Sequence, residues 1–262
     1  MMTVDTTAAL GLAAGLHGAL YGAYKDSPHE SFLVRRFVRE IAIALAVSLA
    51  LPLLYPATRG QSAFVLYLSI FALTRVVTEF WKLFVRVEPQ QDFRIPTQIH
   101  WVKGIVHNPG LRLALGFGFL ASIYGVGALG TLIPEAWPRG LHGLLVGLAI
   151  GIAEAIAGGY KDGTIEGFSW RKFAKSPTFG ALGGVIVSGH TADDVFLLLG
   201  AIGSMRMFLE LLFKIVVRDY APGKFRSMTG PFTEWAVRRR LFLTPYALTW
   251  LLYVLLSSHA NW

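Results

Sequence analysis

Two arginines interrupt otherwise apolar stretches of the sequence, and each is followed four residues later by a glutamate. The pairs are Arg75 with Glu79 and Arg206 with Glu210. Positions four apart share one face of a helix. An arginine at the centre of a bilayer costs about 2.5–3.5 kcal/mol on insertion scales, so both should face the bundle interior and be paired. Two interpretations stay open. The pairs are structural ion pairs that join helices, or they face each other and form the charged lining of a path for a polar substrate.

A second set of charged residues lies in two copies of a longer motif. Each copy begins with Tyr-Lys-Asp and continues with Glu, Phe, Arg and Phe at fixed spacing. The candidate binding residues of this set are Lys25, Asp26, Glu30 and Arg35, and then Lys161, Asp162, Glu166 and Arg171. Arginine forks suit carboxylate or phosphate, whereas lysines offer point charges. Carboxylate oxygens suit a hard divalent cation. The motif therefore offers ligands for such a cation at Asp26, Glu30, Asp162 and Glu166. The motif predicts either this binding site or a salt-bridged elbow between helices.

Phenylalanines alternate with basic residues in SFLVRRFVRE (31–40) and GFSWRKFAK (167–175). This pattern is typical of short amphipathic helices that lie in the headgroup region of a membrane. Glu154 and His17 lie inside apolar runs, where an ionisable residue is a functional candidate by default. For Glu154 the alternative is a protonated carboxyl that is hydrogen-bonded in the core.

Two short segments resemble motifs of known enzyme families. The segment VSGHTADD (187–194) is similar to the Ser-Gly-His element of lipid phosphatases, but the flanking elements are missing. We therefore expect no nucleophilic His190, and Asp193 and Asp194 should cap the next helix. The two Asp-x3-Glu motifs resemble the Asp-rich motifs of intramembrane prenyltransferases, which hold a diphosphate through magnesium. The Asn-Asp-x2-Asp signature of those enzymes is absent from this sequence, so membership is not inferred.

The composition indicates helices that cross a membrane. Hydrophobic residues make up 54% and charged residues 15% of the 262, and the mean hydropathy is +0.52. Soluble domains typically carry about 25% charged residues. A spanning helix needs roughly 20 mostly apolar residues. The predicted spans are 6–24, 41–58, 62–85, 111–134, 139–159, 177–191, 194–216 and 241–258. The predicted fold class is an all-α integral membrane protein of about eight helices.

The basic residues are distributed unevenly between these spans. Of the 24 lysines and arginines, 20 lie in the alternate connections 25–40, 82–112, 161–175 and 214–240. The positive-inside rule places these connections in the cytoplasm and both termini outside, which we expect at a bacterial cytoplasmic membrane. The net charge of +8 then indicates anionic lipid headgroups as partners, and no nucleic acid.

The span predicted at 177–191 is short. Its 15 residues cover only ~22 Å of a hydrocarbon core of ~30 Å. A tilted span that extends back to Phe173, or a re-entrant helix, would also fit, although the alternation of basic connections favours a full crossing. The absence of cysteine excludes disulfides and thiolate chemistry. The N-terminal segment lacks a basic region and a cleavage site, so we expect a retained first helix.

An internal repeat organises the chain. Residues 11–37 and 147–173 share 13 of 27 residues without a gap, at an offset of 136. The Arg–Glu pairs recur at an offset of 131. We predict two domains, 1–134 and 135–262, each with four spans. An even number of spans makes the two repeats parallel, related by a pseudo-two-fold axis along the membrane normal.

Three functions remain open at this level. The first is a transporter or channel for a small anionic or phosphate-bearing solute, with a path at the interface of the repeats, because both charged sets are retained in both copies. The second is an enzyme that acts on a lipid or polyprenyl phosphate at the cytoplasmic face, where metal-bridged carboxylates would serve. The third is a structural subunit of a larger membrane complex. Oligomerisation is also open.

Overall fold

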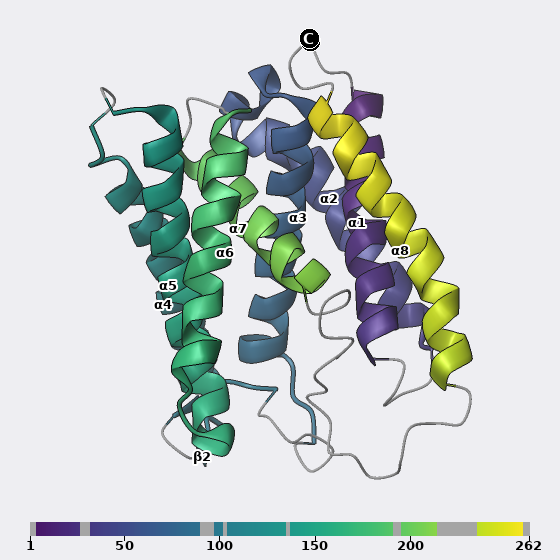
Figure 1. Cartoon of the computed structure of the whole chain (residues 1–262). Helices are drawn as coiled ribbons and strands as arrows, with labels where there is room; N and C mark the ends of the chain where they lie inside the picture. The colour runs from purple at the N-terminus through teal and green to yellow at the C-terminus, as the bar shows by residue number, and fades with distance from the viewer. Residues whose placement is uncertain are drawn as a thin grey trace.

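The structure, a computed structural model, is a bundle of helices with one small hairpin (Figure 1). It describes residues 4–26, 32–89, 97–101, 104–134, 137–190, 195–213 and 235–258. Within these residues there are eight α-helices: α1 (Val4–Asp26), α2 (Val34–Leu54), α3 (Ala63–Phe80), α4 (Pro109–Gly130), α5 (Arg139–Glu166), α6 (Trp170–Ser188), α7 (Val195–Leu212) and α8 (Trp235–Ser258). The antiparallel hairpin pairs β1 (His100–Trp101) with β2 (Gly104–Ile105).

Among the residues that the structure describes, four stretches of helix are long and apolar enough to cross a membrane. They are Val34–Leu54, Ala63–Val85, Pro109–Gly130 and Arg139–Tyr160. A shorter apolar stretch, Leu241–Leu256, lies within α8. The predicted all-helical class is confirmed, and a helix lies at each of the eight positions where the sequence predicts one.

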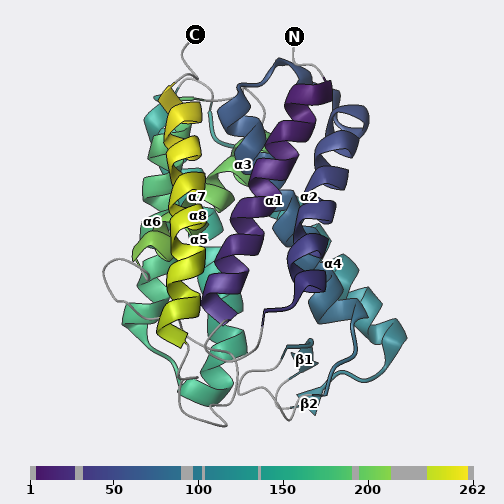
Figure 2. The ribbon, with the colours of Figure 1, turned by 90° about the vertical axis from the view of Figure 1, so that its right-hand side faces the viewer.

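The bundle has two distinct ends (Figure 2). The start of α1 and the end of α8 lie at one of them. The end of α1, the start of α8 and the hairpin lie at the other. We call the latter the basic end, because α2 and α6 begin with basic residues there. Chain segments that the sequence predicts on one side of a membrane therefore lie together.

The prediction of separate amphipathic helices is wrong for the residues that the structure describes. The basic segments form the first turns of α2 and α6, which begin at Val34 and Trp170. Nothing between the basic and apolar parts of α2 interrupts the hydrogen bonding, so extending one helix costs less than nucleating two. α6 runs through Pro177 as far as Ser188, so this helix extends back beyond Phe173.

Local signals define the ends of α3 and α4. The Ser62 side chain accepts a hydrogen bond from the Val65 N–H, and the Asn108 side chain accepts one from the Leu111 N–H. Both are N-caps, which satisfy backbone donors that have no partner within the helix. α3 continues into a π-helical turn, η2 (Trp81–Val85). The Arg86 N–H closes this turn by donating to the Trp81 carbonyl at 2.8 Å. A 3-10 turn, η1 (Pro56–Gly60), connects α2 to the segment before α3.

Two helix pairs, α1 with α2 and α5 with α6, pack through glycines. A Cβ atom on Gly15 would lie 2.7 Å from the Cα of Ile41. A Cβ atom on Gly151 would lie 2.5 Å from the Cα of Pro177. Only a hydrogen fits at either position, so the backbones approach closely. This is the usual way in which helices associate in lipid.

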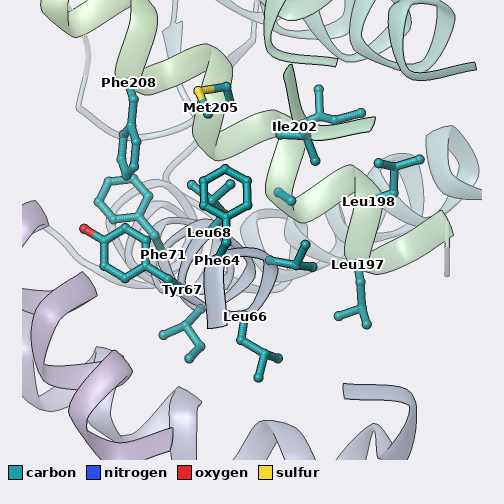
Figure 3. Close-up of a cluster of buried hydrophobic side chains, with 14 of the residues drawn as sticks. Phe64, Leu66, Tyr67, Leu68, Phe71, Leu197, Leu198, Ile202, Met205 and Phe208 are labelled. Carbon is teal, nitrogen blue, oxygen red and sulfur yellow. The ribbon is translucent and has the colours of Figure 1, made fainter. Parts of the chain in front are cut away.

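The centre of the bundle is the apolar contact between α3 and α7 (Figure 3). Its fully buried side chains include Phe64, Tyr67, Leu68, Phe71, Ile202, Met205 and Phe208. Two hydroxyls link the helices, because Ser69 donates to the Leu197 carbonyl at 3.3 Å and Ser204 donates to the Leu68 carbonyl at 2.6 Å. Both serine hydroxyls are therefore satisfied within the apolar core.

Candidate functional site

The first cluster is built around Arg75 of α3. Its Nη1 donates to Glu40 Oε1 of α2 at 3.1 Å, and its Nη2 donates to Glu79 Oε1 at 3.0 Å. Lys82 Nζ lies 2.9 Å from the same Glu79 oxygen. The predicted Arg75–Glu79 pair is confirmed, and Glu40 joins it from the neighbouring helix. We call Glu40, Arg75, Glu79 and Lys82 the first cluster.

The second cluster is built around Arg206 of α7. Its Nη1 donates to Glu210 Oε2 at 2.6 Å, and its Nη2 forms an ion pair with Glu154 of α5. The same Nη1 lies 3.4 Å from the Ser176 hydroxyl of α6. The predicted Arg206–Glu210 pair is confirmed. Glu154 is an ion-pair partner here and not an isolated carboxyl group in the core. We call Glu154, Ser176, Arg206 and Glu210 the second cluster.

The two arginines differ in exposure. The side chain of Arg206 is 6% exposed and that of Arg75 is 24% exposed. Each cluster nevertheless has an accessible carboxylate, because Glu79 is 34% and Glu154 is 39% exposed. Both charged sets are therefore reachable from the surface of the bundle.

The expectation that the two Arg–Glu pairs face each other is wrong. Arg75 turns toward α2, whereas Arg206 turns toward α5 and α6. The contact between α3 and α7 is occupied by the apolar side chains of the core. Charged groups there would lose their hydration without gaining partners, so each arginine lies on the side of its helix that offers a carboxylate.

Glu40, Lys82 and Ser176 are the cluster members that sequence reasoning did not identify, and Glu40 is the carboxylate among them. A repeat search looks for identities, and at the offset of 136 Glu40 aligns with Ser176. The available signal was a carboxylate at the start of an apolar run, although its nearest partners along the chain are Arg36 and Arg39. Its pairing with Arg75 follows only from the packing of α2 on α3.

The Tyr-Lys-Asp motifs lie at the ends of α1 and α5. Arg35 and Arg171, their arginines, are exposed. Lys25 and Asp26 belong to the last turn of α1, and Lys161, Asp162 and Glu166 to the last turns of α5. The side chains of these five residues, and Glu30 entirely, lie outside what the structure describes. The cation site at this motif therefore stays a prediction. Among the described residues, no three His, Asp or Glu side chains form a metal-binding group.

The two histidines of interest occupy apolar surroundings. His17 is fully buried, its Nδ1 lies 2.7 Å from the Tyr67 hydroxyl, and its ring stacks on Phe208 with centroids 4.2 Å apart. His190 follows α6, and its ring lies 4.7 Å from that of Phe64. Asp193 and Asp194 lie outside the described residues, so their capping role is untested. His17 is a hydrogen-bonded residue of the core.

The fold and these clusters define a helical protein with membrane-spanning candidates and charged groups within its helices. A scan against models of protein families found no matching family, and searches of curated proteins and of solved structures found no significant match. The function is therefore inferred from the geometry of the chain itself.

Proposed function

We propose that this chain is a membrane transporter or channel for a small anionic or phosphate-bearing solute. We propose further that it consists of two parallel four-helix halves, 1–134 and 135–262, in a bacterial cytoplasmic membrane with both termini outside. The observation that carries the proposal is that each half holds one arginine within a helix, bound by two carboxylates from two helices.

Helix contacts that recur at the repeat offset support the duplication. Gly15 meets Ile41, and the positions 136 residues later, Gly151 and Pro177, also meet. Gly11 lies against Ser48, and the corresponding Gly147 lies near Gly184, its Cβ position 3.2 Å from the Cα of that glycine. An interface that recurs position by position is the expected result of duplicating one helix pair.

The contact between α3 and α7 is consistent with a pseudo-two-fold axis. The offset of 131 relates Ser69 to Gly200, and a Cβ atom on Gly200 would lie 3.5 Å from the Cα of Ser69. Equivalent positions of two copies meet each other where a two-fold axis passes between them. Arg75 and Arg206 each follow this crossing by six residues.

The two clusters receive their inter-helix carboxylates from different members of the helix pair. Glu40 corresponds to Ser176, and Glu154 corresponds to Gly18. Positions 18 and 40 adjoin each other in the structure, since a Cβ atom on Gly18 would lie 3.1 Å from Glu40 Oε1. Each half therefore has a carboxylate beside its arginine although the residue that carries it differs. This supports a requirement for a charged cluster in both halves, which suits a transporter better than an enzyme with one active site.

The exposure of Glu79 and Glu154 argues for water beside the clusters. A carboxylate that faced hydrocarbon would cost several kcal/mol. A hydrated path along each cluster removes that cost. We therefore propose that the path follows the clusters within the halves, and not the apolar contact between α3 and α7.

Flux into proteoliposomes tests this function. Purified protein is reconstituted, and uptake of radiolabelled phosphate and of acetate is measured for wild type, Arg75→Ala and Arg206→Ala. The matched control is Arg59→Ala, which removes a surface arginine that donates only to the Pro52 carbonyl among the described residues. We expect flux with wild type and with the control, and a loss of at least about tenfold for each cluster variant.

The other outcomes separate the alternatives. Turnover of added lipid phosphate without flux would favour the membrane enzyme. Flux that is unchanged in both arginine variants would reduce the clusters to structural ion pairs. An absence of flux and turnover with both solutes would overturn the proposal and favour the structural subunit.

A further inference from the structure

Four arginines gather at the basic end of the first half, where three helical segments begin or end. Arg36 and Arg39 lie in the first turns of α2, Arg86 follows the π-helical turn η2, and Arg112 lies in the first turn of α4. We call Arg36, Arg39, Arg86 and Arg112 the arginine cluster. The π-helical turn contributes by ending α3 so that Arg86 follows it directly, within electrostatic reach of Arg36 and Arg39.

Direct contacts link part of this cluster. Arg112 donates from Nη2 to the Arg86 carbonyl, and Arg86 Nη2 lies 2.8 Å from Glu88 Oε2. Arg112 is buried, with 3% of its surface exposed. Its position therefore does not depend on a flexible, solvated side chain, and it holds the end of α3 against the start of α4.

Several donors of the cluster have no acceptor. The Nε atoms of Arg39, Arg86 and Arg112 are buried and have no hydrogen-bond partner among the described residues. Buried donors are nearly always satisfied, so three such donors on neighbouring segments favour an acceptor that comes from outside the described residues. Charged donors prefer oxyanions, to which their hydrogen bonds are about twice as strong as neutral ones.

The electrostatics point to the same kind of ligand. Burial lowers the pKa of Arg86. The like charges of Arg36 and Arg39 lower this pKa further, whereas the carboxylates of Glu88 and Glu79 oppose the effect. Like charges held together repel, and an anion between them removes the repulsion. Planar guanidinium forks match the oxygens of a phosphate better than lysine ammonium groups do.

We propose that the arginine cluster is a binding site for a phosphate group at the basic end of the first half. The phosphate belongs to an anionic phospholipid headgroup or to the solute, and the second case rests on the proposed transport function. The second half provides a natural contrast, because the positions that match Arg36 and Arg39 are Lys172 and Lys175. The planar forks at these two positions therefore occur in the first half only.

Binding measurements with purified full-length protein test the site and its ligand. Native mass spectrometry counts bound phosphatidylglycerol against phosphatidylcholine, and equilibrium dialysis measures inorganic phosphate. The variants are Arg36→Gln/Arg39→Gln and, as the matched removal of two charges from the other half, Lys172→Gln/Lys175→Gln. Arg36→Lys/Arg39→Lys keeps the charge and removes the forks, so it remains informative if the glutamine variant fails to fold.

We expect one saturable ligand that weakens by about tenfold or more in both arginine variants and by less than about twofold in the lysine control. Retention of phosphatidylglycerol alone identifies a lipid headgroup, and saturable inorganic phosphate identifies the solute's phosphate. Equal weakening in both halves, full retention in the Arg→Lys variant, or no saturable binding of either probe overturns the site. Because these assays measure binding, a protein that binds phosphate but shows no flux would refute the transport function and leave the site intact.

Discussion

The first and second clusters meet the same electrostatic demand with different residues. Arg75 takes its second carboxylate from α2, remains partly exposed and shares Glu79 with Lys82. Arg206 takes its second carboxylate from α5, is almost fully buried and has the Ser176 hydroxyl beside it. Under the proposed duplication, the arginine keeps a second carboxylate beside it while the helix that supplies this carboxylate changes. It also implies that the second cluster tolerates less disturbance.

The largest effect is expected for Arg206→Ala. Removing one partner of a buried ion pair typically costs about 3–5 kcal/mol, and here Glu210, whose side chain is only 15% exposed, would lose its partner. Arg75→Ala should cost roughly half as much, since Arg75 is more exposed and Lys82 still neutralises Glu79. Denaturant unfolding in mixed micelles measures both. Equal losses would show that the clusters do not differ in burial as described.

The next largest effect is a difference in stability loss between the two glycine-packed helix pairs, α5 with α6 and α1 with α2. A Cβ atom on Gly147 would collide with the Gly180 carbonyl, which is backbone. One on Gly11 would collide with Ser48 Oγ, which can rotate away, and would lie 2.6 Å from Ser48 Cβ, which cannot. Overpacking costs about 1–3 kcal/mol where neighbours cannot move. Gly147→Ala should therefore unfold at lower denaturant than Gly11→Ala. The opposite order would contradict the tighter packing of α5 on α6.

A transplant of the carboxylate tests whether the clusters are interchangeable. Glu40→Ser gives the first half the residue of the second, and adding Gly18→Glu supplies the carboxylate from α1. We expect the double variant to recover part of the stability lost by Glu40→Ser, with a coupling energy of roughly 0.5–3 kcal/mol in a double-mutant cycle. Gly18→Glu alone should destabilise, as its Cβ would lie 3.1 Å from Glu40 Oε1. Additive losses would refute the equivalence.

The smallest effect is expected for Lys82→Met. The Lys82–Glu79 pair is 21% and 34% exposed, and exposed pairs contribute about 0–1 kcal/mol. Glu79 keeps Arg75 as its partner. A loss above ~2 kcal/mol would mean that Lys82 is essential to the first cluster and that the clusters differ more than their geometry indicates.

The sequence predicts those features that depend on neighbours along the chain. Apolar runs place every helix, and a spacing of four places Arg75 beside Glu79. The starts of α2 and α6 were predicted too late, because a basic amphipathic segment and the first turns of a longer helix have the same pattern. Glu40 and the direction in which each arginine turns depend on helix packing, and so does the meeting of Arg39, Arg86 and Arg112. No local spacing contains that information.

The exchange of carboxylates between Glu40 and Glu154 also constrains the history of the chain. Under the proposed duplication, a single ancestral unit gave rise to both arrangements, so one lineage moved its glutamate from one helix to the other. An intermediate with neither of these glutamates would have left the arginine with only the carboxylate four residues later as its partner. An intermediate with both would have placed a Cβ atom 3.1 Å from the other glutamate's oxygen, where two carboxyl groups are stable only if they share a proton. The ancestral site therefore either passed through a protonated pair or relied on that single carboxylate for a time.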